Sequence, residues 1–202
     1  MSEPVQTIRH RATQTTDGLR RLGWSLDEFE RLSALGFFGG IEGPRERVEL
    51  VDGEILPKRA KCGRHEWVRS DLQKELALQL GRDSSVDSVP SWRPGGDLCP
   101  EPEMIVCLAG MKPSEVPPAD VLLLVEVADA SLAYDTGLKA RIYARLGVVD
   151  CWVVNVGTLE TLVHLDPTET GYARLHAVTA AAGLAPTRLP QIRFTLGSLG
   201  FD

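Results

Sequence analysis

Two glutamates stand inside or beside apolar runs, where a carboxylate needs a reason to be. Glu126 interrupts the aliphatic run 122–127, and Glu103 opens another apolar run directly after Pro102. Burying an unpaired carboxylate costs several kcal/mol, so each glutamate is expected at a strand end, beside a cation or on a metal ion. Lys139 follows thirteen residues after Glu126, on the next expected helix. If the two strands are neighbours, both carboxylates converge at one edge of a sheet.

Two carboxylates and a lysine suit metal-assisted chemistry on a phosphate. Mg²⁺ is a hard cation that prefers oxygen ligands. It polarises a phosphate oxygen and lowers the pKa of a bound water. A nearby ammonium can hold that water and offset the negative charge that develops in the transition state. Glu49, in an expected hairpin, is a third acid that could complete such a site.

Each of these residues also has an ordinary structural interpretation. Glu126 could be a strand-end carboxylate in an ion pair, and Glu103 a solvated residue at the start of a strand. Lys139 could form a helix-surface pair with Asp135, four residues earlier. Glu49 could lie on the outward face of a two-stranded ribbon. The residue types alone therefore leave both interpretations open.

The densest basic cluster precedes the helix expected over 65–80. A run of positive side chains can neutralise phosphates and provide salt-dependent affinity that ignores base sequence. The candidate nucleic-acid-binding residues are Lys58, Arg59, Lys61, Arg64 and His65. The alternative is a solvated loop and helix start.

Composition excludes several classes of protein. The chain has 202 residues, with 22 Lys and Arg against 28 Asp and Glu, which gives a net charge of −6. This acidic balance excludes a surface coated with positive charge, but not a local basic patch. Hydrophobic residues make up 43% and charged residues 25%, as in a globular domain.

Cysteine use and hydropathy favour a soluble, cytoplasmic protein with reduced thiols. The four cysteines are far apart and form no C-x-x-C pair, and Cys107 and Cys151 lie in apolar runs typical of a core. The first 23 residues lack the apolar segment of a secretory signal. The most apolar stretch, residues 121–128, is too short to span a bilayer. We therefore expect no membrane partner and no organic cofactor.

Local patterns predict the elements that must position these side chains. Ser25, with Glu28 three residues later, is typical of a helix N-terminus. Asp52 and Gly53 between two alternating runs predict a two-residue hairpin turn, because both positions need positive φ. Apolar residues spaced by four predict a helix over 65–80.

The remaining pattern indicates an α/β domain with a central sheet flanked by helices. The polar residues 1–23 are expected to form a mobile arm, followed by one domain over residues 24–202. The periodicity predicts a second helix over 135–146. Further strands are expected around 86–92, 103–108, 121–128, 151–155, 159–165 and 172–178.

Several segments together resemble the Uma family of restriction-endonuclease-like proteins, within the PD-(D/E)XK nuclease superfamily. The resemblance covers residues 24 to the C-terminus. It rests on the segments Trp24-Ser25-Leu26-Asp27-Glu28-Phe29, Val48-Glu49-Leu50-Val51-Asp52-Gly53-Glu54-Ile55, His65, Pro102-Glu103, Val125-Glu126-Val127, Asp135, Lys139, Tyr143, Gly147-Val148 and Trp152-Val153-Val154.

The resemblance implies a restriction-endonuclease-like mixed sheet with an N-terminal helix and hairpin. It also implies Mg²⁺- or Mn²⁺-dependent hydrolysis of DNA phosphodiester bonds. Glu103 takes the position of the family's metal-binding aspartate and Glu126 the second acidic position, with the carbonyl of Val127 as a further ligand. Lys139 takes the position of a catalytic lysine shifted onto the helix, and Glu49 that of the acid in the hairpin.

The sequence departs from the family pattern at three places. Glu103 replaces an aspartate, Ala128–Ser131 replaces a serine-proline segment, and Asn155 replaces a late aspartate. These departures keep an alternative open, in which a weak or inactive nuclease fold serves as a DNA-binding or assembly module. A structural oligomer without a nucleic-acid role is a third interpretation. Apolar residues in the late strands could also support a homodimer.

Overall fold

The computed structural model describes residues 11–14, 20–38, 47–58, 63–88 and 91–200. It divides into two compact units, and we describe each by itself. The first unit comprises the chain up to Lys58 together with residues 95–100, and the second comprises residues 59–94 and 101–202. The expected arm over residues 1–23, followed by one domain over 24–202, stays a prediction.

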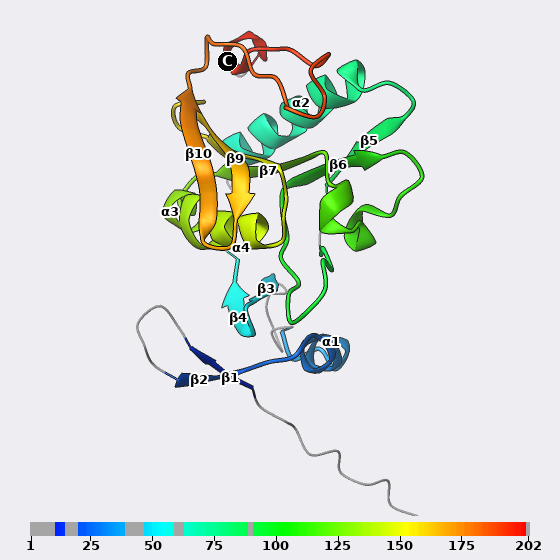
Figure 1. Ribbon diagram of the computed structural model, residues 1–202, viewed down its shortest axis with the longest axis vertical. Helices are drawn as coiled ribbons and strands as arrows, with labels where there is room; N and C mark the ends of the chain where they lie inside the picture. The colour runs from blue at the N-terminus through cyan, green and yellow to red at the C-terminus, as the bar shows by residue number, and fades with distance from the viewer. Residues whose placement is uncertain (1–10, 15–19, 39–46, 59–62, 89–90, 201–202) are drawn as a thin grey trace, which may run out of the picture. The chain divides into compact units, whose positions relative to one another are not determined.

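In the first unit, two short strands precede a capped helix (Figure 1). Strand β1 (Arg11–Gln14) pairs antiparallel with β2 (Arg20–Gly23), an element that the polar sequence did not indicate. Residues 1–10 and 15–19 of the expected arm lie outside the described part. Helix α1 (Leu26–Ala34) begins as predicted, because Ser25 and Glu28 form a reciprocal capping box.

The hairpin of the first unit also forms as predicted. Strand β3 (Val48–Val51) pairs antiparallel with β4 (Glu54–Pro57). Asp52 and Gly53 have φ values of 50° and 78°, which the right-handed twist of a two-residue hairpin requires. Leu50 exchanges backbone hydrogen bonds with Cys99, and its side chain packs with Cys99 and Phe29 in a small core.

A six-stranded mixed sheet organises the second unit, in the order β10-β9-β8-β7-β6-β5 (Figure 1). All neighbours are antiparallel except β7 and β8, which are parallel and therefore need a crossover connection. The strands are β5 (Ser84–Asp87), β6 (Met104–Leu108), β7 (Leu123–Ala128), β8 (Asp150–Asn155), β9 (Thr161–Thr168) and β10 (Gly171–Val178).

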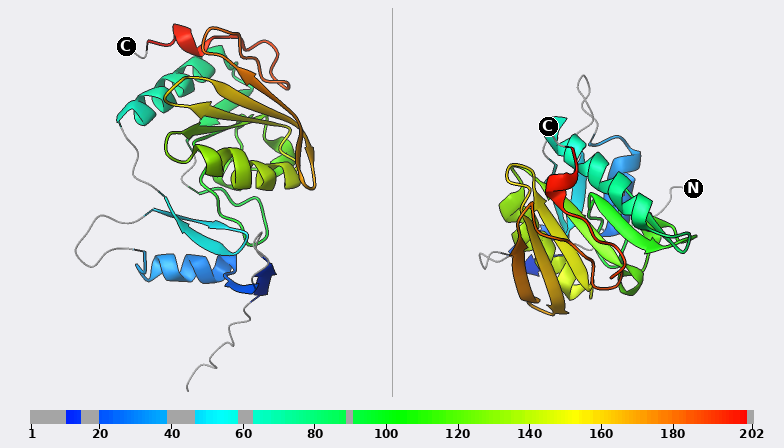
Figure 2. Two further views of the ribbon diagram at one scale, coloured as in Figure 1. Left: turned by 90° about the vertical axis from the view of Figure 1, so that its left-hand side faces the viewer. Right: turned by 90° about the horizontal axis from the view of Figure 1, so that it is seen from above.

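The two faces of this sheet are covered by different elements (Figure 2). Helix α2 (Gly63–Gln79) and the C-terminal segment cover one face. The crossover between β7 and β8 covers the other, through α3 (Leu132–Tyr134), the π-helical segment η3 (Asp135–Lys139) and α4 (Ala140–Arg145). Short 3₁₀ turns are η1 (Pro113–Glu115), η2 (Pro118–Asp120) and η4 (Leu196–Ser198).

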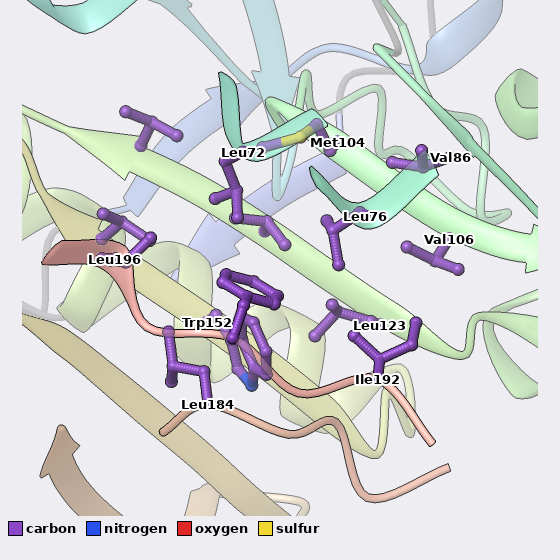
Figure 3. Close-up of a cluster of buried hydrophobic side chains, with 14 of the residues drawn as sticks. Leu72, Leu76, Val86, Met104, Val106, Leu123, Trp152, Leu184, Ile192 and Leu196 are labelled. Atoms are coloured by element: carbon purple, nitrogen blue, oxygen red, sulfur yellow. The ribbon is translucent and has the colours of Figure 1, made fainter. Parts of the chain in front are cut away.

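The main core of the second unit lies between the sheet, α2 and the C-terminal segment. Figure 3 shows Trp152 between the sheet and the segment that carries Leu184 and Ile192. The Trp152 ring also lies 6.2 Å from the ring of Phe194, centroid to centroid. The apolar spacing of α2, read from the sequence, is confirmed, because Leu72 and Leu76 are fully buried in this core.

The crossover helix differs from its prediction in one respect. A single helix was expected over 135–146, but the segment contains a π turn, in which the N–H of Ala140 donates to the carbonyl of Asp135, five residues earlier. Such turns insert one residue into a helix and often occur at functional sites. This π turn ends at Lys139, so it sets the direction in which the lysine leaves the helix.

The burial of two cysteines agrees with the sequence-based expectation. Cys107 and Cys151 are buried in the core as predicted, Cys99 is buried in the first unit, and Cys62 lies outside the described residues. Burial raises the pKa of the Cys151 thiol, and the charge of Glu126 adds to that shift. Among the described residues, no helix is long and apolar enough to cross a membrane.

Candidate active site

Glu126 lies in the most deeply buried strand of the second unit. All six residues of β7 are buried, and only 2% of Glu126 is exposed. Alternation along the strand separates Val125, which packs on the α2 side, from Leu124, which packs on the α4 side. Glu126 shares the side of Leu124. A charged group at this depth requires partners, and the crossover supplies them.

Lys139 is the charged partner of Glu126. Its Nζ lies 2.6 Å from Glu126 Oε1, and the two side chains are only 2% and 3% exposed. Nζ also donates to the backbone carbonyl of Glu101 at 3.4 Å. The Lys139 ammonium is therefore buried against a strand carboxylate, rather than spread on a helix surface. Asp135, the alternative partner considered from the sequence, accepts a hydrogen bond from Ser131 Oγ at 2.6 Å.

A second donor reaches the same oxygen of Glu126. The hydroxyl of Tyr143, fully buried in α4, donates to Glu126 Oε1 at 2.6 Å. Tyr143 is one of the residues that carry the family resemblance, but no role was expected for it from the sequence. The signal that could have found it is the spacing, because residues four apart share one face of a helix and Lys139 and Tyr143 are four apart.

Glu103 directly precedes the strand that pairs with the strand of Glu126. Strands β6 and β7 are antiparallel neighbours, and their ladder ends with Met104 paired to Val125. Glu103 is the residue before Met104, and it is buried as Glu126 is. The convergence of the two carboxylates at one metal site stays a prediction.

His65 lies among these groups and not on the surface. Its ring is buried, and Nε2 lies 2.8 Å from the carbonyl oxygen of Val127. A carbonyl only accepts, so Nε2 carries the proton and donates. The same Nε2 is 3.7 Å from Glu103 Oε1, and Nδ1 is 3.3 Å from Glu66 Oε1. The sequence grouped His65 with the basic run as a candidate nucleic-acid-binding residue, and that role stays a prediction.

The donor set of the cluster fits a hard divalent cation. Among the described residues, no group of three or more His, Cys, Asp or Glu side chains is arranged to hold a metal ion. Two carboxylates are nevertheless sufficient for Mg²⁺, which keeps several waters and takes further oxygens from a bound phosphate. Glu103 and Glu126 are the carboxylates that could hold such a cation, and the carbonyl of Val127 follows Glu126 in β7.

The roles given to the remaining candidates stay predictions. Glu49 is buried in β3 of the first unit, and Lys58 also belongs to that unit. Arg59 and Lys61 lie outside the described residues. Arg64 is exposed at the start of α2, and its Nε donates to the carbonyl of Val156 at 3.0 Å.

Asn155 has a local structural role in the turn that follows β8. Its Oδ1 accepts the backbone N–H groups of Gly157 at 2.8 Å and Thr158 at 3.2 Å. An asparagine in this position orders the turn that follows β8. This side chain is thus engaged with its own turn.

Comparison with known proteins identifies the family. The family model described as "Putative restriction endonuclease" matches residues 26–197. The chain belongs to this family, Uma2. The membership predicted from the sequence is therefore confirmed. A comparison with curated proteins finds no match.

A solved structure shows the same fold as this Uma2 chain. It is described as "a putative nuclease belonging to DUF820" from Anabaena variabilis ATCC 29413, with 14% sequence identity. The match has a TM-score of 0.66 and covers 87% of this chain and 96% of that chain. The predicted fold class, a restriction-endonuclease-like mixed sheet flanked by helices, is confirmed. Family and fold together support a nuclease-like function.

Proposed function

We propose that this Uma2 protein is a divalent-metal-dependent endonuclease that hydrolyses DNA phosphodiester bonds. The observation that carries the proposal is the buried contact of 2.6 Å between Lys139 Nζ and Glu126 Oε1, with the buried Glu103 directly before the neighbouring strand β6. Breaking a buried ion pair costs about 3–5 kcal/mol, and apolar residues of similar volume often stabilise as well as the intact pair. The buried pair of Glu126 and Lys139 is therefore expected to add little net stability, whereas its two charges suit catalysis.

The side chains divide the work according to their chemistry. Glu103 and Glu126 would hold Mg²⁺ or Mn²⁺ through carboxylate oxygens, with the Val127 carbonyl beside them. The bound cation would polarise the phosphate and acidify a water molecule. Lys139 would orient that water and offset charge on the phosphate in the transition state. The supporting role of Glu49 stays an expectation from the sequence.

The reaction is a hydrolysis in which the water oxygen forms a bond to phosphorus. The bond between phosphorus and one ester oxygen breaks, and that oxygen takes up a proton. The products are a phosphate monoester and a hydroxyl end. The basic residues Lys58, Arg59, Lys61 and Arg64 would bind the DNA backbone and supply affinity without base specificity.

A plasmid assay tests the proposal. Supercoiled plasmid is incubated with the purified protein and Mg²⁺ or Mn²⁺, with and without a chelator. We expect metal-dependent nicking by the wild type, and a loss of about 10²–10³-fold in rate for Lys139→Met, the magnitude typical of removing one stabilising group. Lys112→Met is the matched control, because Lys112 is an exposed lysine that pairs with Glu115 at 3.0 Å.

The double variant Glu126→Gln/Lys139→Met keeps the test independent of folding. It removes both charges together, so no uncompensated charge stays buried. We expect a folded, inactive protein, with folding checked by a thermal melt. Nicking by this variant at the wild-type rate, or a wild type that cuts with neither metal, would overturn the proposal. The second outcome would favour a DNA-binding or assembly module with the same fold.

A further inference from the structure

Tyr143 is a buried polar residue in contact with the proposed metal ligand Glu126. Its hydroxyl donates to Glu126 Oε1 at 2.6 Å, the same oxygen that Lys139 Nζ contacts at 2.6 Å. The two donors come from one helical stretch, four residues apart. One carboxylate oxygen of Glu126 is thereby held from two directions by groups of the crossover.

Packing fixes the ring that carries this hydroxyl. Tyr143 belongs to the core on the α4 side of the sheet, together with Ile105 and Leu124. Its ring centroid lies 6.1 Å from that of Trp92, whose Nε1 donates to the carbonyl of Val116 at 2.9 Å. Because the ring is wedged among buried side chains, the hydroxyl cannot follow Glu126 if the carboxylate moves. It therefore acts as a fixed reference point.

A fixed donor has value for a carboxylate that holds a metal ion. Mg²⁺ requires near-ideal octahedral geometry, so its ligands have to be presented in a defined orientation. Hydrogen bonds to ligating side chains supply that orientation, and their loss typically costs 10–100-fold in metal affinity or activity. A hydrogen bond to an ionised carboxylate is also about twice as strong as one between neutral groups.

We propose that Tyr143 is a positioning residue, which orients the Glu126 carboxylate toward the cation, while Lys139 orients the water. The inference rests on the proposed function. Lys139 contacts Glu126 through a flexible four-carbon side chain, whereas the tyrosine ring has few rotatable bonds and is packed in the core. Removal of the hydroxyl leaves Glu126 with its charge and its lysine, but with less defined orientation.

The experiment compares two tyrosine-to-phenylalanine variants. Tyr143→Phe removes the hydroxyl that contacts Glu126 and keeps the ring. Tyr172→Phe removes a hydroxyl of the same core that donates to the backbone carbonyl of Val148 at 2.8 Å, and it serves as the matched control. Mn²⁺ binding to each protein is titrated calorimetrically in the absence of DNA, thermal melts are recorded, and plasmid nicking is measured separately.

We expect Tyr143→Phe to weaken Mn²⁺ binding about 10–100-fold. Tyr172→Phe is expected to bind Mn²⁺ as the wild type does, even where its melting temperature falls to a similar extent. Mn²⁺ affinity of Tyr143→Phe within twofold of the wild-type value would overturn the inference. An equal loss in both variants would do the same, because it would show a structural effect only.

The separate readouts distinguish this inference from the proposed function. A wild type that binds Mn²⁺, loses it in Tyr143→Phe and yet does not nick DNA would support the positioning role and overturn the hydrolysis. A wild type that nicks DNA, with Tyr143→Phe equal to it in binding and rate, would overturn the positioning role alone. A wild type that binds no Mn²⁺ would overturn both.

Discussion

The side chain of Asp150 holds the backbone of Thr187, with the Thr187 N–H donating to Asp150 Oδ2 at 2.6 Å. This bond joins the start of β8 to the C-terminal segment, which lies over Trp152 and contributes Leu184 and Ile192 to the core. Asp150 is buried, and burial raises the pKa of its carboxyl, partly offset by the hydrogen bonds from Thr187.

The raised pKa of Asp150 predicts a pH-dependent stability. The pKa of Asp150 in the folded protein lies above the ordinary value of 3.8. The contribution of Asp150 to the free energy of unfolding is therefore most favourable below pH 3.8 and is lost as the pH rises through the folded pKa. Asp150→Asn keeps an acceptor for Thr187 and removes the titration. We expect the melting temperature of Asp150→Asn, relative to wild type, to increase with pH. A difference that stays constant between about pH 4 and pH 8 would contradict this.

The contribution of His164 to stability is predicted to change with pH in the opposite direction to that of Asp150. Its ring is buried against the ring of Tyr172, 5.4 Å between centroids, and burial lowers the pKa of His164 below the ordinary 6.5. The stability that this residue contributes is therefore present above pH 6.5 and is lost as the pH falls, because unfolding exposes a histidine that binds protons more readily. We therefore expect the urea midpoint of His164→Gln to change less than that of the wild type between neutral and acidic pH.

His176→Gln is the matched control for His164, since His176 lies in β10 and is exposed. We expect its urea midpoint to follow the wild type at each pH. If His164→Gln also retains the full acid sensitivity of the wild type, burial of His164 is not a source of that sensitivity.

His65 is predicted to matter through its contact with Val127 and not through phosphate binding. His65→Leu removes the donor to the Val127 carbonyl, and a buried carbonyl deprived of a donor costs about 1–3 kcal/mol. His65→Gln keeps an N–H donor of similar reach and should retain more stability and more metal-dependent nicking. Urea unfolding and plasmid nicking measure the two effects. If His65→Gln weakens DNA retention while leaving stability unchanged, the phosphate-binding interpretation is the better one.

The basic residues before α2 and in its first turn are predicted to supply salt-dependent DNA affinity. Each phosphate contact that is lost should reduce the slope of log affinity against log salt concentration by about 0.9. The measurement is gel retention of a duplex at several salt concentrations in the presence of a chelator. The variant replaces four residues by glutamine: Lys58, Arg59, Lys61 and Arg64.

A control for this charge change comes from two lysines elsewhere on the second unit. Lys74 and Lys112 are exposed and pair with Asp71 and Glu115, at 2.8 Å and 3.0 Å. Replacing both by glutamine should leave the slope unchanged. A similar decrease in slope for the control would assign the affinity to overall charge instead of the basic run.

Local features of the fold could be predicted because their causes are local. The Asp52-Gly53 turn depends on two positive φ values, and the start of α1 depends on the reciprocal bonds of Ser25 and Glu28. The pairing of β1 with β2 and the π turn before Ala140 could not be predicted in this way. Neither leaves a periodic hydrophobic pattern, and both depend on what the backbone meets in space.

The residues of the candidate site stay a prediction, and the contacts among them could be anticipated from the sequence only in part. A carboxylate inside an aliphatic strand draws attention to Glu126, and Glu103 directly precedes β6, the strand that pairs with β7. The burial of His65 depends on the first turn of α2 lying over the end of β7, which is 62 residues away in the chain. A local sequence pattern does not reveal a contact between residues 62 positions apart. The sequence therefore suggested a surface position for His65.

The π turn makes the site sensitive to insertions and deletions. Successive residues of an α-helix are about 100° apart around its axis, so a one-residue deletion between Ala128 and Lys139 would turn the ammonium away from Glu126. Strands β7 and β8 and their cores would keep every residue. A relative could thus lose its chemistry by a single deletion while keeping its fold. The length of this connection, beside the identity of its residues, is therefore a criterion for which relatives keep the acid–lysine pair.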